Sequence, residues 1–242
     1  MVLSAEKNTK GYKAVEQLPG CCVPACLQMI FRRHSIPFIP SQETIGNHLG
    51  LTIPPTVKKY FRGQVRISEK MPPGGYGTRI NKKKYSLNTL FQNSQIPLKA
   101  EFIFINKIPD ENFLRELIRA IVKDEKRDCI MCVQSGSLEG DPDPDNGHVI
   151  LLSGADQRGI YFIEPGDGTI AKTTYHDLYQ GMVLRSCKNW GGMWSIRSLE
   201  RKYGAGRRMK EDCHDGDFTK TAQILQRPVP RAPDRPHAPG PS

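Results

Sequence analysis

The hydrophobic positions of this 242-residue chain change their spacing along the sequence. In the first half they recur every three or four residues, which is typical of helices with one buried face. In the second half they form short apolar runs bounded by Gly, Asn, Asp and Pro, which is typical of strands joined by turns. Helices first and antiparallel strands later predict an α+β fold.

The helical pattern predicts four helices, over residues 24–34, 41–49, 86–93 and 110–123. Pro24 suits the first turn of the first helix, where its missing N–H is not needed. Ser41 can cap the second helix, Gly50 can end it, and Asp110 can cap the fourth. The first helix would bury a stripe formed by Cys26, Leu27, Ile30 and Phe31.

The apolar runs predict strands over residues 101–105, 128–134, 148–152 and 159–163. A turn around 156–159 would join the last two as a hairpin. Residues 182–185 and 194–196 are weaker strand candidates. Together with the first helix, these strands predict a helix packed on an antiparallel sheet.

Composition divides the chain into three parts. Residues 1–14 are polar and are predicted to be flexible, residues 15–203 are predicted to form one domain, and residues 204–242 form a Pro-rich tail that is predicted to be disordered. Inside the domain, residues 52–81 form a long irregular region centred on a Gly/Pro loop at 72–77. A loop of this length is often functional, so the Gly/Pro loop could be a lid, a substrate contact or a structural Ω-loop.

The chain is basic, with a net charge of +10 and a pI of about 9.3. The charge is spread along the sequence and no nucleic-acid recognition motif accompanies it, which favours a solvated basic surface over specific nucleic-acid binding. No apolar run is long enough to span a membrane, and the N-terminus lacks the apolar core of a signal peptide. The cysteines number seven, an odd count. These observations predict a cytoplasmic protein with free thiols.

Three cysteines crowd around the start of the first predicted helix: Cys21, Cys22 and Cys26. A cysteine just before a helix N-terminus lies at the positive end of the helix dipole, which favours the nucleophilic thiolate. Cys22 fits this place best, with Cys21 as the alternative and Cys26 as a core residue one turn later. Gln17, a few residues upstream, could stabilise an oxyanion together with the Cys22 backbone N–H.

His148 is the candidate proton carrier for this thiol, because it opens an apolar strand after a turn-rich segment. The following strand ends at Glu164. In a hairpin the start of the first strand lies beside the end of the second, so Glu164 could orient the His148 ring. Asp167 is the second candidate for this role.

These two blocks resemble peptidase family C39 of the papain-like superfamily. Cys22-Val23-Pro24-Ala25-Cys26-Leu27 resembles the nucleophile helix of that family, and His148 to Leu152 with the later Glu164-Pro165 resembles its His-strand-turn-strand-Asp-Pro segment. Gln17 is similar to the family's oxyanion glutamine. The chain departs from the family pattern at Val23, where Gly is usual, at Cys21 and at Glu164, where Asp is usual. The resemblance implies a papain-like fold and a Cys22–His148–Glu164 triad without a cofactor.

The remaining candidate residues have structural interpretations. Cys129 and Cys132 form a C-x-x-C inside a strand, so their side chains should point to opposite faces rather than hold zinc. Cys21, Cys22, Cys26 and His34 lack a partner pair with zinc-site spacing. His34, His48 and His176 have no acid or cysteine in a suggestive arrangement, and the acidic cluster Asp141, Asp143 and Asp145 lacks the Gly and closing Glu of a calcium loop.

The residues therefore predict a cysteine-dependent hydrolase, a peptidase or amidase acting on a peptide or protein substrate through a thioester acyl-enzyme. Two alternatives stay open. The same apparatus could transfer the acyl group to an amine or thiol, as in transglutaminase-like or phytochelatin-synthase-like enzymes, or the domain could bind peptides without catalysis. No metal or organic cofactor is expected, and the substrate itself and the oligomeric state are left undetermined.

Overall fold

The structure is a computed structural model that describes residues 8–134, 136–139, 147–186 and 191–199. The chain divides into two units, residues 1–203 and 204–242, and every described residue belongs to the first. The predicted Pro-rich tail, Cys187, Cys213 and the aspartates of the 141–145 cluster lie outside the described residues.

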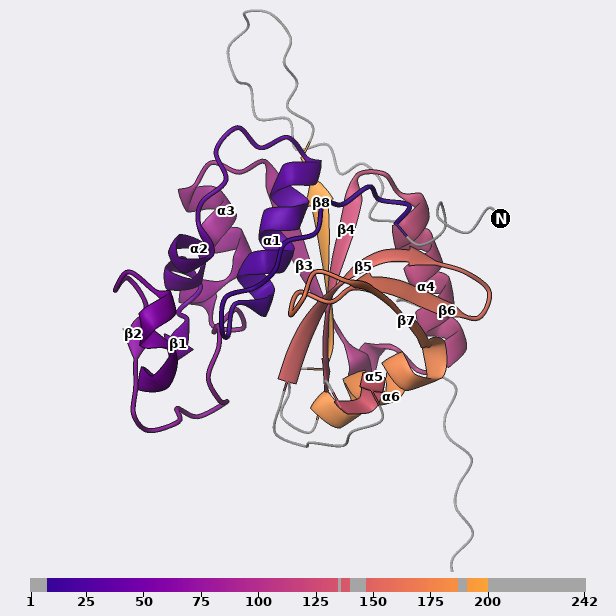
Figure 1. Cartoon of the computed structure of the whole chain (residues 1–242). Coiled ribbons are helices and arrows are strands. Elements are labelled where there is room, and N and C mark those ends of the chain that lie inside the picture. The colour runs from indigo at the N-terminus through magenta and orange to yellow at the C-terminus, as the bar shows by residue number, and fades with distance from the viewer. Residues whose placement is uncertain (1–7, 135, 140–146, 187–190, 200–242) are drawn as a thin grey trace, which may run out of the picture. The chain divides into compact units, whose positions relative to one another are not determined.

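Six strands of the described residues form one antiparallel sheet in the order β3-β8-β4-β5-β6-β7 (Figure 1). Their bounds are β3 Leu98–Phe104, β4 Arg127–Gln134, β5 Gly147–Ala155, β6 Gly159–Ile163, β7 Ile170–Thr174 and β8 Gly192–Ser198. Alternate side chains of β4 enter two different core clusters: Ile130 and Cys132 join one, while Cys129 and Met131 join the other. The centre of the sheet is therefore buried on both faces.

Helices cover both faces of this sheet (Figure 1). Their bounds are α1 Cys22–Arg33, α2 Gln42–His48, α3 Leu87–Asn93, α4 Glu111–Lys123, α5 Gly136–Glu139 and α6 Tyr175–Ser186. α1 packs on β4 and β5 and shares its core cluster with α2 and α3, whereas α4 and α6 belong to the cluster on the opposite face. The predicted α+β fold, with an N-terminal helix on an antiparallel sheet, is confirmed.

Short polar side chains define where three of these helices begin. Ser41, Ser86 and Asp110 each accept a hydrogen bond from the backbone N–H three residues later, at 2.8 to 3.2 Å. Each bond satisfies an N–H that has no partner inside the helix. The caps predicted at Ser41 and Asp110 are thus confirmed.

The structure corrects the prediction for residues 182–185, which belong to α6 and not to a strand. Their apolar run is too short to show a period by itself. In the folded chain Tyr175, Leu178 and Met182 recur at helical spacing and are buried in one core cluster. β7 was not predicted, because only one of its five residues is buried.

Residues 8–14 also differ from the predicted flexible N-terminus. Tyr12 is 5% exposed and packs in the core cluster under α1, and Lys10 is buried beside it. The Lys10 ammonium donates to the Ile121 carbonyl at 3.0 Å. Tyr12 and Lys10 therefore pack against the domain that was predicted to begin at residue 15.

The long irregular region over 52–81 holds a small parallel pair of strands, β1 Thr52–Ile53 and β2 Arg66–Ile67. A 3₁₀ helix, Pro55–Tyr60, connects them, and two more occur at Lys83–Tyr85 and Ile105–Lys107. Thr52 also forms a bridge to Gly77, so β1 is hydrogen-bonded to the end of the Gly/Pro loop.

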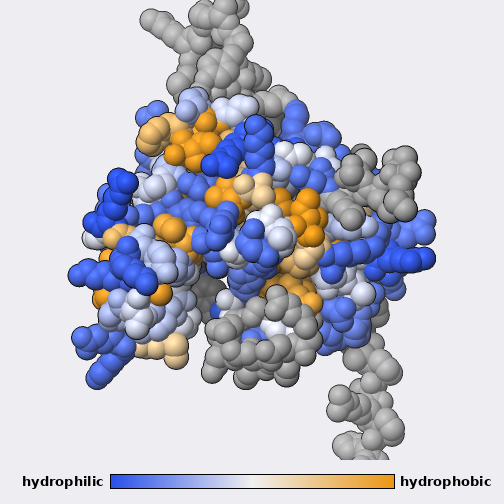
Figure 2. Space-filling model, viewed as in Figure 1, coloured by the Kyte–Doolittle hydropathy of each residue, from blue (hydrophilic) through white to orange (hydrophobic). Residues whose placement is uncertain are grey.

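The surface seen in Figure 2 is mostly hydrophilic, with hydrophobic side chains in separate patches. Apolar groups scattered in this way are ordinary for a folded protein in water. Within the described ranges, no helix is both long and apolar enough to cross a membrane.

Candidate active site

Cys22 is the first residue of α1, and Cys21 stands at the N-cap. The helix thus begins two residues before the predicted start at Pro24, and Cys22 lies in its first turn. Backbone N–H groups there have no acceptor inside the helix and carry the positive end of its dipole. Among the described residues, the structure shows no acceptor for the Cys22 N–H. This N–H is therefore available to a bound oxyanion.

Burial distinguishes Cys22 from the two cysteines around it. Cys22 is half-buried, whereas Cys21 and Cys26 are fully buried. Burial raises the pKa of the Cys21 thiol to about 12, and it raises the pKa of Cys26 well above the usual value. Cys21 packs against Leu51 and Ile53. Of the three thiols, Cys22 is the one that a substrate can reach.

His148 and Glu164 meet across the β5–β6 hairpin, as the sequence predicts. The His148 Nε2 lies 2.7 and 2.9 Å from the two carboxylate oxygens of Glu164. Asp156 forms the turn, where its side chain accepts from the N–H groups of Arg158 and Gly159 at 2.7 and 2.9 Å. A bulge between Leu152 and Gly154 adjusts the register of the hairpin. The turn therefore brings the start of β5 to the end of β6.

Glu164 is itself held in place by the turn that follows it. The Gly166 N–H donates to Glu164 Oε1 at 2.7 Å, and the Glu164 N–H donates to the Thr169 carbonyl at 2.9 Å. Asp167, the alternative acid, accepts from the N–H and hydroxyl of Thr169 instead, and these bonds lower its pKa. Glu164 is therefore the carboxylate that contacts the His148 ring.

The second nitrogen of the His148 ring takes no part in the hydrogen bonds with Glu164. Because Nε2 faces Glu164, Nδ1 is the ring nitrogen that remains for another partner, and Cys22 lines the same cavity as His148. Burial alone would lower the pKa of His148, but the hydrogen bonds and charges of Cys22 and Glu164 outweigh it and raise the pKa to about 10. The ring is thus an imidazolium at neutral pH.

Gln17 lies next to the same hairpin. Its backbone N–H donates to the Pro165 carbonyl at 2.7 Å, and its side-chain Oε1 is buried without a partner among the described residues. Gln42 of α2 clamps the chain on both sides of it, accepting from the Leu18 N–H and donating to the Glu16 carbonyl, each at 2.7 Å. Gln42 is a positioning residue that the sequence analysis missed, because only the tertiary fold brings α2 to this segment.

A cavity of about 120 Å³ opens over Cys22 and His148. The Gly/Pro loop forms one wall of it, through Pro73, Gly74, Tyr76 and Gly77. The Arg79 guanidinium ties this loop together by donating to the carbonyls of Gly75, Gly77 and Thr78 at 2.6 to 3.2 Å. The loop therefore borders the candidate active site.

The cysteines of the C-x-x-C pair lie on opposite faces of β4, as predicted. Cys129 belongs to the core cluster under α4 and α6, and Cys132 to the cluster under α1. Burial raises the pKa of Cys132 to about 12 and that of Cys129 further. Among the residues that the structure describes, no three His, Cys, Asp or Glu side chains gather where they could hold a metal ion.

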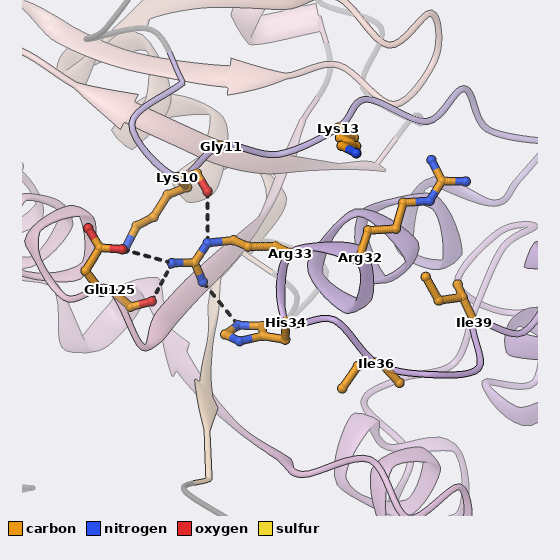
Figure 3. A pocket seen from close by; sticks show the side chains of 9 residues that line it. All are labelled: Lys10, Gly11, Lys13, Arg32, Arg33, His34, Ile36, Ile39 and Glu125. Carbon is orange, nitrogen blue, oxygen red and sulfur yellow. Dashed lines mark hydrogen bonds and ion pairs between the residues drawn. The ribbon is translucent and has the colours of Figure 1, made fainter.

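His34 stands at the other end of α1, in a second concavity lined by Lys10, Lys13, Arg32, Arg33 and Glu125 (Figure 3). Its Nε2 lies 2.6 Å from Asp128, a fully buried acid that the sequence analysis did not connect to it. His34 is therefore a satisfied structural histidine and lies too far along the helix to join Cys22. His48 and His176 are exposed, and His176 Nδ1 lies 3.5 Å from Glu111.

No protein-family model matches the chain, and no curated protein matches it with significance. Among solved structures, it is similar to a putative C39-like peptidase from Bacillus anthracis, with 14% identity over 79% of this chain and 98% of that one and a TM-score of 0.49. It is also similar to a double-glycine-motif protease from an AMS/PCAT transporter, solved with its leader peptide, with 14% identity over 78% of this chain and 94% of that one and a TM-score of 0.44. The chain thus has structural similarity to C39-type peptidases at low sequence identity.

Proposed function

We propose that this protein is a cysteine-dependent hydrolase of peptide or amide bonds. Cys22 is the nucleophile, His148 carries the proton and Glu164 orients the His148 ring. One observation carries the proposal: His148 contacts Glu164 through Nε2 and lines the same cavity as Cys22. This is the nucleophile–base–orienting-group relation that activates a thiol.

The raised pKa of His148 defines the resting state. A protonated ring beside Cys22 would stabilise the thiolate that attacks the substrate. The N-terminus of α1 adds its dipole on the thiolate side, and Glu164 balances the imidazolium on the other. His148 therefore acts first as an acid.

Acylation follows from this state. The Cys22 sulfur attacks the substrate carbonyl carbon, and the electron pair of the C=O bond moves to oxygen. When the tetrahedral intermediate collapses, the C–N bond breaks and His148 gives its proton to the leaving nitrogen. A thioester on Cys22 remains. Water then attacks the thioester, His148 accepts the proton of that water, and the acid product leaves with the thiolate restored.

The oxyanion of each intermediate would accept from the Cys22 backbone N–H and from the Gln17 side-chain amide. Two features support these donors: the Cys22 N–H has no described acceptor, and the Gln17 backbone is fixed by its N–H bond to the Pro165 carbonyl, beside the residue that contacts His148. We expect Gln17→Ala to lower kcat by about 10²- to 10³-fold with a smaller change in KM. Gln42→Ala should move both parameters, because it releases the segment that carries Gln17.

Thiol mapping tests the proposal directly. The protein is treated with substoichiometric iodoacetamide at about pH 6, where an ordinary thiol is protonated and slow, and the labelled cysteine is found by mass spectrometry. Cys22 should outpace the other cysteines, and His148→Ala should remove this advantage. Cys21→Ser is the matched control, because it removes the neighbouring thiol and keeps Cys22.

Turnover is then measured on a peptide mixture, with Cys22→Ala as the inactive reference. Product masses that gain one water per cleavage support hydrolysis, whereas masses that gain an added amine or thiol would assign acyl transfer in its place. If no thiol reacts faster than the rest and no peptide is consumed, the catalytic proposal is wrong and a peptide-binding role remains.

A further inference from the structure

Arg185, on the last turn of α6, lies against the candidate active site. It lines the cavity that holds Cys22 and His148. Its guanidinium covers the residue before His148: a Cβ added at Gly147 would lie 1.9 Å from Arg185 Cζ. Only glycine at 147 leaves room for the guanidinium at this place.

The environment of Arg185 does not neutralise its charge. The structure gives its side chain no hydrogen bond or ion pair with any described residue, although the side chain is half-buried. Burial lowers the pKa of Arg185, and the nearby thiols of Cys132 and Cys22 partly offset this effect. A guanidinium that has lost part of its hydration without gaining an anion is costly to the folded state unless something binds it.

The part of the cavity wall that the structure describes is cationic. Its described lining includes Arg79, Lys82 and Arg185 and contains no Asp or Glu. The Arg79 guanidinium is occupied by loop carbonyls, and Lys82 is exposed at the rim. Arg185 is thus the cation placed to meet a bound molecule beside the reacting atoms.

Size limits what can bind there. A cavity of about 120 Å³ is smaller than the roughly 150 Å³ that holds a benzene ring. A carboxylate matches both the space and the flat, two-pronged guanidinium, which binds carboxylates through two parallel hydrogen bonds.

We propose that Arg185 is a specificity-determining residue that binds a carboxylate of the substrate next to the scissile bond. This inference rests on the proposed function. The carboxylate is supplied either by an Asp or Glu side chain within about two residues of the cut or by a free C-terminus close to it. Both sources share the same recognition chemistry.

The test is a cleavage profile. A mixed peptide library is digested with the wild-type protein, and the residues flanking each cut are read by mass spectrometry. We expect enrichment of Asp and Glu near the cut, or of cuts within two residues of a free C-terminus. Repeating the digestion with C-terminally amidated peptides separates the two sources, since only the second loses its cuts.

Variants of Arg185 assign the preference to this side chain. For a cleaved acidic peptide, Arg185→Gln should lower kcat/KM by roughly 10- to 100-fold. For the matched peptide in which an amide replaces that carboxylate, the same variant should change kcat/KM less than about threefold. Arg185→Lys should recover part of the loss, and Arg185→Glu should favour basic residues near the cut. Arg158→Gln, an exposed arginine in the β5–β6 turn, is the charge-matched control.

Three results would overturn the inference. The first is cleavage by the wild type without acidic enrichment. The second is an equal loss on acidic and amide peptides in Arg185→Gln together with slower alkylation of Cys22, which would make Arg185 a thiolate-positioning residue. The third is that all three Arg185 variants are unfolded by circular dichroism and the wild-type cleavage profile shows no preference for acidic residues. A wild type that cleaves nothing and shows no fast thiol instead contradicts the proposed function itself.

Discussion

A histidine–carboxylate pair lies near each end of α1, and the two pairs have different surroundings. At the N-terminal end His148 lies 2.7 Å from Glu164, and at the C-terminal end His34 lies 2.6 Å from Asp128. The helix between them has twelve residues, about 18 Å. The distance between the ring and the acid is nearly the same in both pairs. Any difference in their roles must therefore come from the residues around them.

At the C-terminal end the carboxylate is shared by several donors within the protein. Asp128 is fully buried and accepts from the Tyr12 hydroxyl, from Arg33 at 3.1 Å and from His34. Arg33 also donates to the Lys10 carbonyl and faces Glu125, as Figure 3 shows. This network joins the N-terminal segment, α1 and β4. Its role is structural.

At the N-terminal end, polar groups of the site remain accessible to a bound molecule. Glu164 keeps its side chain 21% exposed, His148 lines a cavity together with Cys22, and Arg185 has no hydrogen-bond or ion-pair partner among the described residues. A His–carboxylate pair becomes a candidate for catalysis when the other ring nitrogen meets a nucleophile and a cavity admits substrate.

Removal of each histidine in turn is expected to give the largest difference between the two pairs. We expect His148→Ala to lower kcat/KM by about 10³- to 10⁶-fold with little change in stability, because the proton carrier is lost. We expect His34→Ala to leave kcat/KM within a few-fold and to lower the urea midpoint. Equal effects on activity would refute the assignment of the two pairs.

Glu164→Gln separates orientation from charge at the N-terminal pair. It should lower kcat by about 10²- to 10⁴-fold. Because Glu164 helps to raise the pKa of His148, its loss should lower that pKa, so the alkaline limb of the pH–rate profile should move to lower pH. Asp167→Asn is the matched control and should leave the profile in place. If the alkaline limb of the Glu164→Gln profile stays at the wild-type pH, Glu164 is not the partner of the His148 ring.

Asp128→Ala tests the C-terminal pair by leaving Tyr12, Arg33 and His34 without their common acceptor. We expect it to lower the free energy of unfolding by about 3–5 kcal/mol, as for other broken buried ion pairs. Urea denaturation measures this loss. Glu164→Ala, at a partly exposed site, should cost clearly less, and the reverse order would contradict a structural role for Asp128.

Tyr12→Phe makes the smallest change, removing one hydroxyl from the Asp128 network. Since the Asp128 carboxylate keeps its bonds to Arg33 and His34, we expect a loss of about 1–2 kcal/mol with kcat/KM unchanged. The same urea titration and peptide assay measure both quantities. A drop in kcat/KM without a change in stability would show that the two ends of α1 are coupled.

Local chemistry in the sequence determined much of the fold and of the candidate site. The caps at Ser41 and Asp110, the turn at Asp156 and the helix that begins near Cys22 each depend on neighbours within a few residues. The meeting of His148 and Glu164 was also predictable, because a hairpin brings the ends of consecutive strands together whatever the rest of the chain does.

Only the tertiary structure decided the features that depend on distant segments. Residues 182–185 form a helix because Met182 packs with Tyr175 and Leu178 on the sheet, and this helix carries Arg185 to Gly147. Asp128 captures His34 across 94 positions, which no spacing rule predicts. Such contacts become favourable once the sheet has closed the intervening loops, so their cause lies in packing and burial and is absent from any short stretch of sequence.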